Sequence, residues 1–154
     1  MHAFEKNIKD LDLNIPDMIA PIANYVPYKI SEKSLYRSGQ SPIKDGVMLY
    51  VGKVGSDLSE EEGIKAAELC CINIIASLKS AINNDWNRLD QFIKLGGFVN
   101  CNSDFTNQPK IINGASDLLI KIFGEQGKHS RFAVGSNSLP MNCSVEIDAI
   151  IKIH

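Results

Sequence analysis

Two segments of the chain carry hydrophobic residues at the three- and four-residue spacing of an amphipathic helix. The first follows Ser59-Glu60-Glu61-Glu62, a capping box in which Ser59 accepts from a first-turn amide and Glu62 returns the bond. Its apolar positions are Ile64, Ala67, Cys71, Ile74, Ile75, Leu78 and Ile82. The second helix has Pro109 in its first turn and Gly124 placed to end it. Its stripe is Ile111, Ile112, Ala115, Leu118, Leu119, Ile122 and Phe123.

The other hydrophobic stretches favour β-strands, which we expect at residues 34–39, 47–52, 91–100, 131–135 and 143–153. Because Pro42 and Asp45-Gly46 supply turn chemistry between the first two strands, we predict that these strands form a hairpin. The pair Gly96-Gly97 suggests a bulge or the close approach of another backbone to the third strand.

The last predicted strand has two unlike faces, because successive side chains of a strand point to opposite sides. One face is apolar and consists of Cys143, Val145, Ile147, Ala149, Ile151 and Ile153. The other carries Ser144, Glu146, Asp148, Ile150 and Lys152. Since this second face mixes charges with an isoleucine, we expect it to meet either water or another subunit.

The order of the predicted elements is β-β-α-β-α-β-β, which indicates a two-layer α+β domain with both helices on one face of a mixed sheet. Residues 1–20 look like an N-terminal extension, and residues 21–154 form the domain. Within the extension, Leu11, Leu13 and Ile15 alternate before Pro16, so a short helix and an edge strand fit equally well. Residues 20–24 are small and turn-prone.

Composition narrows the classes of function. The 154 residues are 44% hydrophobic and 22% charged, as in an ordinary globular domain. A net charge of -2 provides no general field for nucleic acid or an anionic membrane, although a small basic pocket remains possible. No apolar run is long enough to span a bilayer, and the amino terminus does not read as a leader. Four cysteines without a C-x-x-C motif indicate buried thiols in a reducing compartment, so we expect a cytoplasmic protein.

The strongest candidates for chemistry are Arg131 and Glu146, which lie on the last two strands. If these strands share a sheet, the two side chains could face a common cleft. There the arginine would hold a substrate carboxylate and the glutamate would hold or activate a water. On spacing alone, a structural ion pair is the more frequent arrangement. His129 could assist such a site or be a surface residue. Neither a phosphate loop nor a metal-ligand cluster is present, so we expect no cofactor and no metal.

These same strands resemble a known motif. The stretches Arg131-Phe132-Ala133-Val134-Gly135, Leu139-Pro140 and Val145-Glu146-Ile147-Asp148-Ala149 are similar to the carboxy-terminal motif of the RidA family, also called YjgF/YER057c/UK114 or L-PSP endoribonuclease-like. The resemblance covers roughly residues 22–153. It includes Ser38-Gly39-Gln40, the capped helix after Ser59, and Asp104-Phe105.

The resemblance implies a chorismate-mutase-like fold that assembles as a homotrimer with sites between subunits. It implies hydrolysis of reactive enamine or imine intermediates to 2-oxo acids and ammonia, without a cofactor. Arg131 matches the arginine that binds the substrate carboxylate, and Glu146 matches the glutamate that positions the water. The other matching substrate-binding positions are Asn113, Ser38 and Tyr25, with Tyr28 as a second choice for the tyrosine.

Two further functions stay open. Phe132 and Ala133 stand where typical members carry a small hydroxyl residue and a cysteine. The absent cysteine motivates a non-catalytic trimer that binds a small carboxylate and regulates a partner. An endoribonuclease, suggested by the older family name, is the least supported, because the chain lacks net positive charge and a basic-aromatic stripe.

Overall fold

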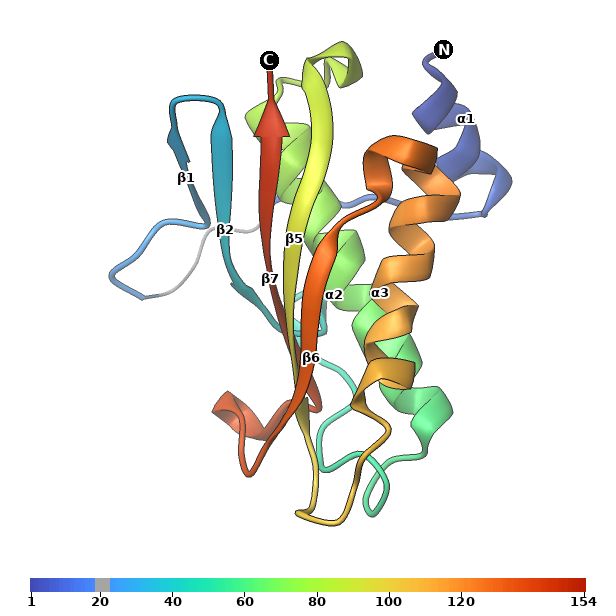
Figure 1. Ribbon diagram of the computed structural model, residues 1–154, viewed down its shortest axis with the longest axis vertical. Coiled ribbons are helices and arrows are strands. Elements are labelled where there is room, and N and C mark those ends of the chain that lie inside the picture. Colours follow the sequence, from blue (N-terminus) through green and yellow to red (C-terminus); the bar gives the residue numbers. More distant parts are fainter. Residues whose placement is uncertain (19–22) are drawn as a thin grey trace.

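The computed structural model describes residues 1–18 and 23–154 of the chain (Figure 1). The helices are α1 (Ala3–Asp10), α2 (Glu60–Ala81) and α3 (Gln108–Phe123), with short 3-10 turns at Trp86–Arg88, Gly124–Gly127 and Pro140–Asn142. The strands are β1 (Tyr28–Ser31), β2 (Ser34–Gln40), β3 (Ile43–Lys44), β4 (Val47–Met48), β5 (Leu89–Asn100), β6 (Ser130–Ser136) and β7 (Val145–Ile153).

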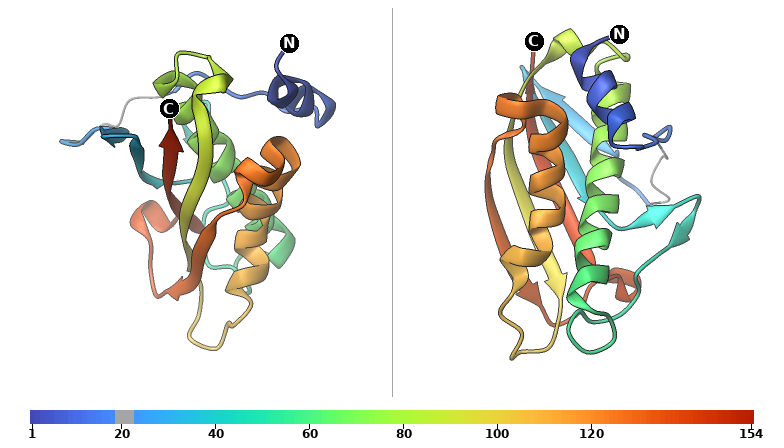
Figure 2. Two further views of the ribbon diagram at one scale, coloured as in Figure 1. Left: turned by 45° about the horizontal axis from the view of Figure 1, so that its top comes forward. Right: turned by 90° about the vertical axis from the view of Figure 1, so that its right-hand side faces the viewer.

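Five of the strands form one sheet in the order β1-β2-β7-β5-β6, and β3 pairs with β4 in a separate two-stranded sheet. The pair β5 and β6 is parallel, because α3 carries the chain back between them, and the other pairs are antiparallel. The right-hand view of Figure 2 shows α2 and α3 lying side by side on one face of the sheet. The predicted two-layer α+β fold with a mixed sheet is therefore confirmed.

Both long helices begin and end as their sequences predict. Ser59 Oγ accepts a hydrogen bond from the Glu62 amide at 3.2 Å and donates to the Glu62 carboxylate at 3.4 Å. Three carboxylates in the first turn of α2 complement the positive end of its helix dipole. Gly124 ends α3 with a φ of 59°, a backbone conformation that favours glycine.

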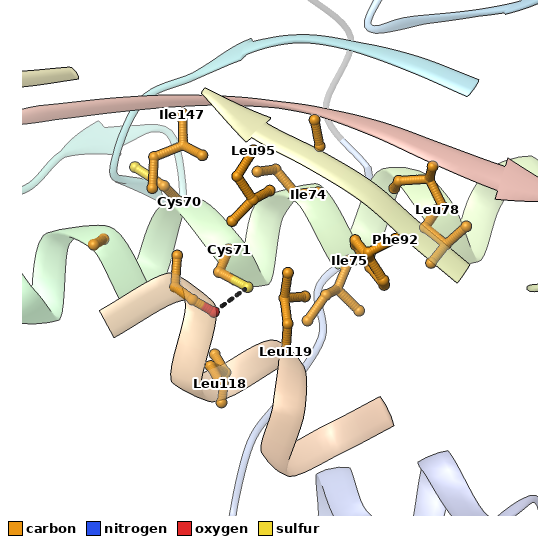
Figure 3. Packing of buried hydrophobic residues seen from close by; sticks show 14 of the residues in the cluster. Cys70, Cys71, Ile74, Ile75, Leu78, Phe92, Leu95, Leu118, Leu119 and Ile147 are labelled. Atoms are coloured by element: carbon orange, nitrogen blue, oxygen red, sulfur yellow. Dashed lines mark hydrogen bonds between the residues drawn. The ribbon is translucent and has the colours of Figure 1, made fainter. Parts of the chain in front are cut away.

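The apolar stripes of α2 and α3 pack against the odd-numbered side chains of β7 and against β5 (Figure 3). Cys71 lies between the two helices, where its thiol donates to the Ala115 carbonyl at 3.6 Å. Burial raises the pKa of both Cys70 and Cys71, so these thiols stay protonated and unreactive. All four cysteines are buried free thiols that act as small hydrophobic residues, as the sequence predicts.

Gly97 of β5 allows α3 to lie close to the sheet, whereas Gly96 faces Asp148 and Phe132 on the other side. A methyl group on Gly97 would stand 2.8 Å from side-chain carbons of Ile112 on α3. Both glycines keep regular partners on β7, and the register shifts of β5 lie nearer its start, between Leu89 and Lys94. The predicted close approach is thus present, but it is made by side chains, and no bulge forms at the glycines.

The predicted hairpin between residues 34–39 and 47–52 is wrong. Both edges of β2 are occupied, by β1 and β7, so no edge remains for β4. Asp45 and Gly46 instead adopt positive φ values of 51° and 77° and connect β3 directly to β4. This result follows from the reach of a two-residue turn, which pairs the residues immediately beside it.

The amino-terminal segment forms a helix, one of the two structures its sequence allows. Phe4 of α1 is buried, with its ring centroid 5.0 Å from that of Phe123 and 6.3 Å from that of Trp86. Asn7 donates from its side-chain amide to the Ile122 carbonyl at 2.7 Å. α1 therefore packs on the carboxyl end of α3. The boundary expected between residues 20 and 21 lies outside the described residues.

Candidate functional site

Arg131 lies on β6, an edge strand of the sheet, and its side chain points toward the helix layer. Its backbone partner on β5 is Leu95, a fully buried residue of the helix-facing side. The guanidinium donates from Nη1 to Ser116 Oγ at 3.0 Å and from Nη2 to the Pro109 carbonyl at 3.2 Å. Both acceptors are neutral groups of α3. Among residues 1–18 and 23–154, Arg131 forms no ion pair, so its charge is available to a ligand.

Glu146 lies on β7 and points to the opposite, open face of the sheet, opposite Phe98 of β5. Its carboxylate lies against the backbone of Gly39, because a methyl group at that position would stand 2.9 Å from Glu146 Oε1. Partial burial, together with the negative charge of Asp148, raises the pKa of Glu146 above its ordinary value. A carboxyl group with a raised pKa is better suited to exchange protons with a substrate near neutral pH.

Arg131 and Glu146 lie in one sheet, but within one chain they point to opposite faces, so the possibility raised from the sequence that they face a common cleft is not met inside a single chain. Arg131 and Glu146 also form no ion pair with each other within the described part of the chain, so the structural alternative is absent there as well. The reason is the strand register. Leu95 aligns with both Arg131 and Ala149, so Arg131 shares the face of the odd-numbered residues of β7, whereas Glu146 is even-numbered.

Ser38 lies on β2, which pairs with both β1 and β7, and Tyr25 lies in the segment before β1. The Ser38 hydroxyl donates to the Val26 carbonyl at 2.7 Å, which ties the segment before β1 to β2. Ser38 directly precedes Gly39, the residue that contacts Glu146. Tyr25 is 56% exposed, and it lies near enough to Arg37 to oppose the lowering of the Arg37 pKa by burial. The alternative residue, Tyr28, is part of β1 and pairs with Arg37.

Asn113 is exposed on α3 and does not reach Glu146 or Arg131 through any hydrogen bond within residues 1–18 and 23–154. It lines a shallow surface hollow between α2 and α3, together with Glu68 and Lys110. The structure thus groups Glu146 with Ser38 on the open side of the sheet, while Arg131 and Asn113 belong to the opposite side.

Sequence reasoning missed Ser116, which is the direct partner of Arg131. This serine is 8% exposed and lies among the apolar residues of the α3 stripe. Its Oγ lies 2.8 Å from His129 Nε2, so it joins the histidine to the arginine. A polar residue within a buried helix stripe is the signal that could have identified it, since such a group needs a hydrogen-bond partner.

The geometry defines a two-layer α+β protein with an arginine anchored to neutral groups at one sheet edge and a partly buried carboxylate on the open sheet face. A family described as "YjgF/chorismate mutase-like, putative endoribonuclease" matches residues 5–151. The chain belongs to this family. The predicted RidA-type resemblance is thereby confirmed.

Individual relatives agree with this assignment. Protein TCP17 of Trypanosoma cruzi is 38% identical over 149 residues, covering 96% of this chain and 92% of TCP17. The crystal structure of Atu1372 from Agrobacterium tumefaciens, a protein of unknown function, is 45% identical with a TM-score of 0.92, covering 99% of this chain and 93% of that one. E. coli TdcF with bound serine shares the fold at 20% identity and a TM-score of 0.61, covering 88% of this chain and 92% of TdcF. Within the described residues, no helix is long and apolar enough to cross a membrane.

Proposed function

We propose that the protein is a homotrimeric hydrolase that converts reactive enamine or imine intermediates to 2-oxo acids and ammonia. The observation that carries this proposal is that the chain holds both an anchored Arg131 and a Glu146 with a raised pKa, each at the position that the family motif gives it. A guanidinium recognises a carboxylate, and a carboxylate with a raised pKa can activate water.

The sheet surface supports assembly of the site from two subunits. β6 has one unpaired edge, and the open face exposes large apolar side chains, namely Tyr36, Phe98 and Val134. Phe98 also packs edge-on against Phe132, with 5.3 Å between ring centroids. An exposed apolar face next to a free strand edge is typical of a protein–protein interface. In a ring of three subunits, the β6 edge of one chain would bring its Arg131 to the open face of the next, beside that subunit's Glu146.

The chemistry needs only these groups and water. Arg131 binds the carboxylate of a 2-imino acid and orients its C=N bond. Glu146 takes a proton from water as the oxygen attacks the electrophilic iminium carbon, which gives a carbinolamine. The nitrogen then takes that proton from Glu146, the C–N bond breaks to release ammonia, and the hydroxyl oxygen passes its remaining proton to the Glu146 carboxylate as it becomes the carbonyl. The products are a 2-oxo acid and ammonia.

The ligand class agrees with a structural neighbour, since serine, which is bound in the TdcF structure, combines a small carboxylate with an amine. This supports a small carboxylate-bearing imine, enamine or 2-oxo acid as the partner of Arg131. The proposal also places the reaction in the cytoplasm, which the four free thiols support.

One observation favours a second candidate, a trimer that binds small carboxylates without turnover. Ala133 is partly buried on the helix-facing side of β6, the side that also carries Arg131. A methyl group there offers no thiol to a substrate. Binding of 2-oxobutyrate without any imine hydrolysis would support this candidate over the enzyme.

Replacing the arginine tests the enzymatic proposal. We expect Arg131→Ala to lower kcat/KM for an enzymically generated 2-imino acid about 100-fold, mainly through KM, because orientation of the carboxylate is lost. Ammonia and 2-oxo acid release are the measurements. Lys128→Ala removes a neighbouring exposed cation and serves as the control, with a rate near wild type. Equal rates for Arg131→Ala and the wild type would refute the mechanism.

The contact between Gly39 and Glu146 makes a second prediction. Gly39→Ala should leave the fold intact, because the added methyl group meets the end of a flexible side chain, but it should displace the carboxylate. We expect imine hydrolysis to fall about 10- to 100-fold with little change in melting temperature. In a Glu146→Gln background, the same substitution should cause no further loss. An additional loss there would show that Gly39 acts on the site by another route.

A further inference from the structure

Ser116 and His129 form a chain of hydrogen bonds beneath the candidate carboxylate-binding arginine. His129 Nδ1 lies 2.7 Å from the Gly127 carbonyl oxygen, and His129 Nε2 lies 2.8 Å from Ser116 Oγ. Ser116 Oγ lies in turn 3.0 Å from Arg131 Nη1. The three side chains come from α3, from the loop before β6, and from β6 itself.

The chemistry of the groups sets the direction of every bond in this chain. A carbonyl oxygen only accepts, so His129 Nδ1 carries a proton and donates it to Gly127. Burial, with a smaller contribution from the Arg131 charge, lowers the pKa of His129, so the ring is neutral near pH 7 and Nε2 is an acceptor. The Ser116 hydroxyl therefore donates to Nε2, which leaves its oxygen lone pairs to accept from Arg131.

We propose that Ser116 and His129 are positioning residues that hold the Arg131 guanidinium in the orientation that binds a ligand carboxylate. This inference rests on the proposed function for the role of Arg131 and adds two residues to it. A free arginine side chain loses rotamer entropy when it is fixed, so a guanidinium that is already anchored binds a planar anion with a smaller entropic loss. Ser116 holds one nitrogen of the fork, and the Pro109 carbonyl holds the other.

A serine bonded to a neutral histidine also resembles a nucleophile with its general base. The surroundings of Ser116 argue against that role. The residue is 8% exposed in the middle of α3, and its oxygen already accepts from Arg131. An attacking oxygen needs an open approach and a free lone pair, whereas a positioning residue needs neither.

Two matched pairs of variants test the hydrogen bonds that link His129, Ser116 and Arg131. Calorimetry on the assembled, full-length protein uses 2-oxobutyrate as the probe. Ser116→Ala removes the acceptor for Arg131, whereas Ser116→Thr retains an oxygen. His129→Asn can still donate to Gly127 but no longer reaches Ser116, whereas His129→Gln places an acceptor near the Nε2 position. We expect Ser116→Ala and His129→Asn to bind 2-oxobutyrate about tenfold more weakly, and the conservative variants to stay within about threefold of wild type.

Imine hydrolysis by the same variants separates positioning from a general structural role. We expect Ser116→Ala and His129→Asn to raise KM about tenfold with kcat nearly unchanged. Equal losses in all four variants, or a fall confined to kcat, would overturn the proposal. Covalent labelling of Ser116 by a fluorophosphonate would also overturn it, because that result would make the serine a nucleophile.

A spectroscopic measurement needs no ligand and no turnover. In ¹⁵N NMR spectra, His129 should be the Nδ1–H tautomer, and slowly exchanging Arg131 side-chain N–H signals should disappear in Ser116→Ala. An Nε2–H tautomer would contradict the proposed direction of the hydrogen bonds between Ser116 and His129 and would overturn the proposal. If the wild type binds 2-oxobutyrate and shows this tautomer but hydrolyses no imine, the proposed function fails while the positioning role stands. If the wild type binds no 2-oxobutyrate, the positioning role fails.

Discussion

Mixing inactive Arg131→Ala subunits with inactive Glu146→Gln subunits is expected to restore imine hydrolysis. The two side chains lie on opposite faces of one sheet, so a site that contains both needs two chains. A mixed assembly can place an intact arginine of one subunit beside an intact glutamate of its neighbour. If the arginine and the glutamate of a site belonged to the same chain, mixing the two variants would not restore activity.

The size of the recovery follows from the symmetry of the ring. Arg131→Ala alone should lose about 100-fold in kcat/KM and Glu146→Gln about 10²–10⁴-fold, so both variants are nearly inactive at substrate concentrations below KM. In a closed ring with one type of head-to-tail interface and random assembly from equal amounts, about one quarter of the sites receive both intact groups. We therefore expect about one quarter of the wild-type rate after the subunits have been dissociated and reassembled together, measured as ammonia release.

The controls separate assembly from simple contamination or misfolding. The same proteins mixed without dissociation should stay inactive. Mixed rings confirmed by sedimentation and mass spectrometry that remain inactive would contradict the two-chain site. Glu146→Gln should fold well, because the raised pKa of Glu146 means that ionisation costs more in the folded chain than in the unfolded one. The stability cost of that ionisation grows as the pH rises through the folded pKa, and a neutral glutamine does not incur it.

Gly114→Ala should be a strongly damaging substitution despite its small size, because it lies where α2 and α3 pack together. A methyl group at this position of α3 would overlap with the backbone carbonyl oxygen of Ile64 on α2. Because that oxygen belongs to a helix backbone, the two helices would have to separate, and their shared core would loosen. We expect a loss of about 2 kcal/mol in the free energy of unfolding, after the better helix propensity of alanine offsets part of the overlap.

Denaturant unfolding at fixed protein concentration measures this loss, since assembly of the proposed trimer would add to the apparent stability. Asp117→Ala, at an exposed position of the same helix, is the matched control and should change the stability by less than about 0.5 kcal/mol. A Gly114→Ala protein as stable as this control would show that α2 and α3 can move apart without lowering the free energy of unfolding.

Hydrophobic spacing and capping residues predicted the two long helices, because both depend on interactions between residues close together in the sequence. The periodic stripes of α2 and α3, the Ser59 cap and the Gly124 stop all appear where the sequence indicates them. β1 was missed because it has only four residues, most of them exposed, and four alternating positions are too few to stand out from a loop. The segment after Pro42 was paired with the wrong strand, because turn residues indicate where a chain reverses but not which edge of a sheet is already occupied.

Alternation along a strand is a local property, so the sequence of β7 was enough to place Glu146 on its mixed face. The sequence of β6 alone could not show that Arg131 points to the opposite side of the sheet. That outcome depends on how β5 aligns with both β6 and β7. The hydrogen bonds of Ser116 with His129 and Arg131 also depend on the tertiary structure, because they form where α3 packs beside β6. Register and helix placement are set by packing between segments distant along the chain, and no single segment encodes them.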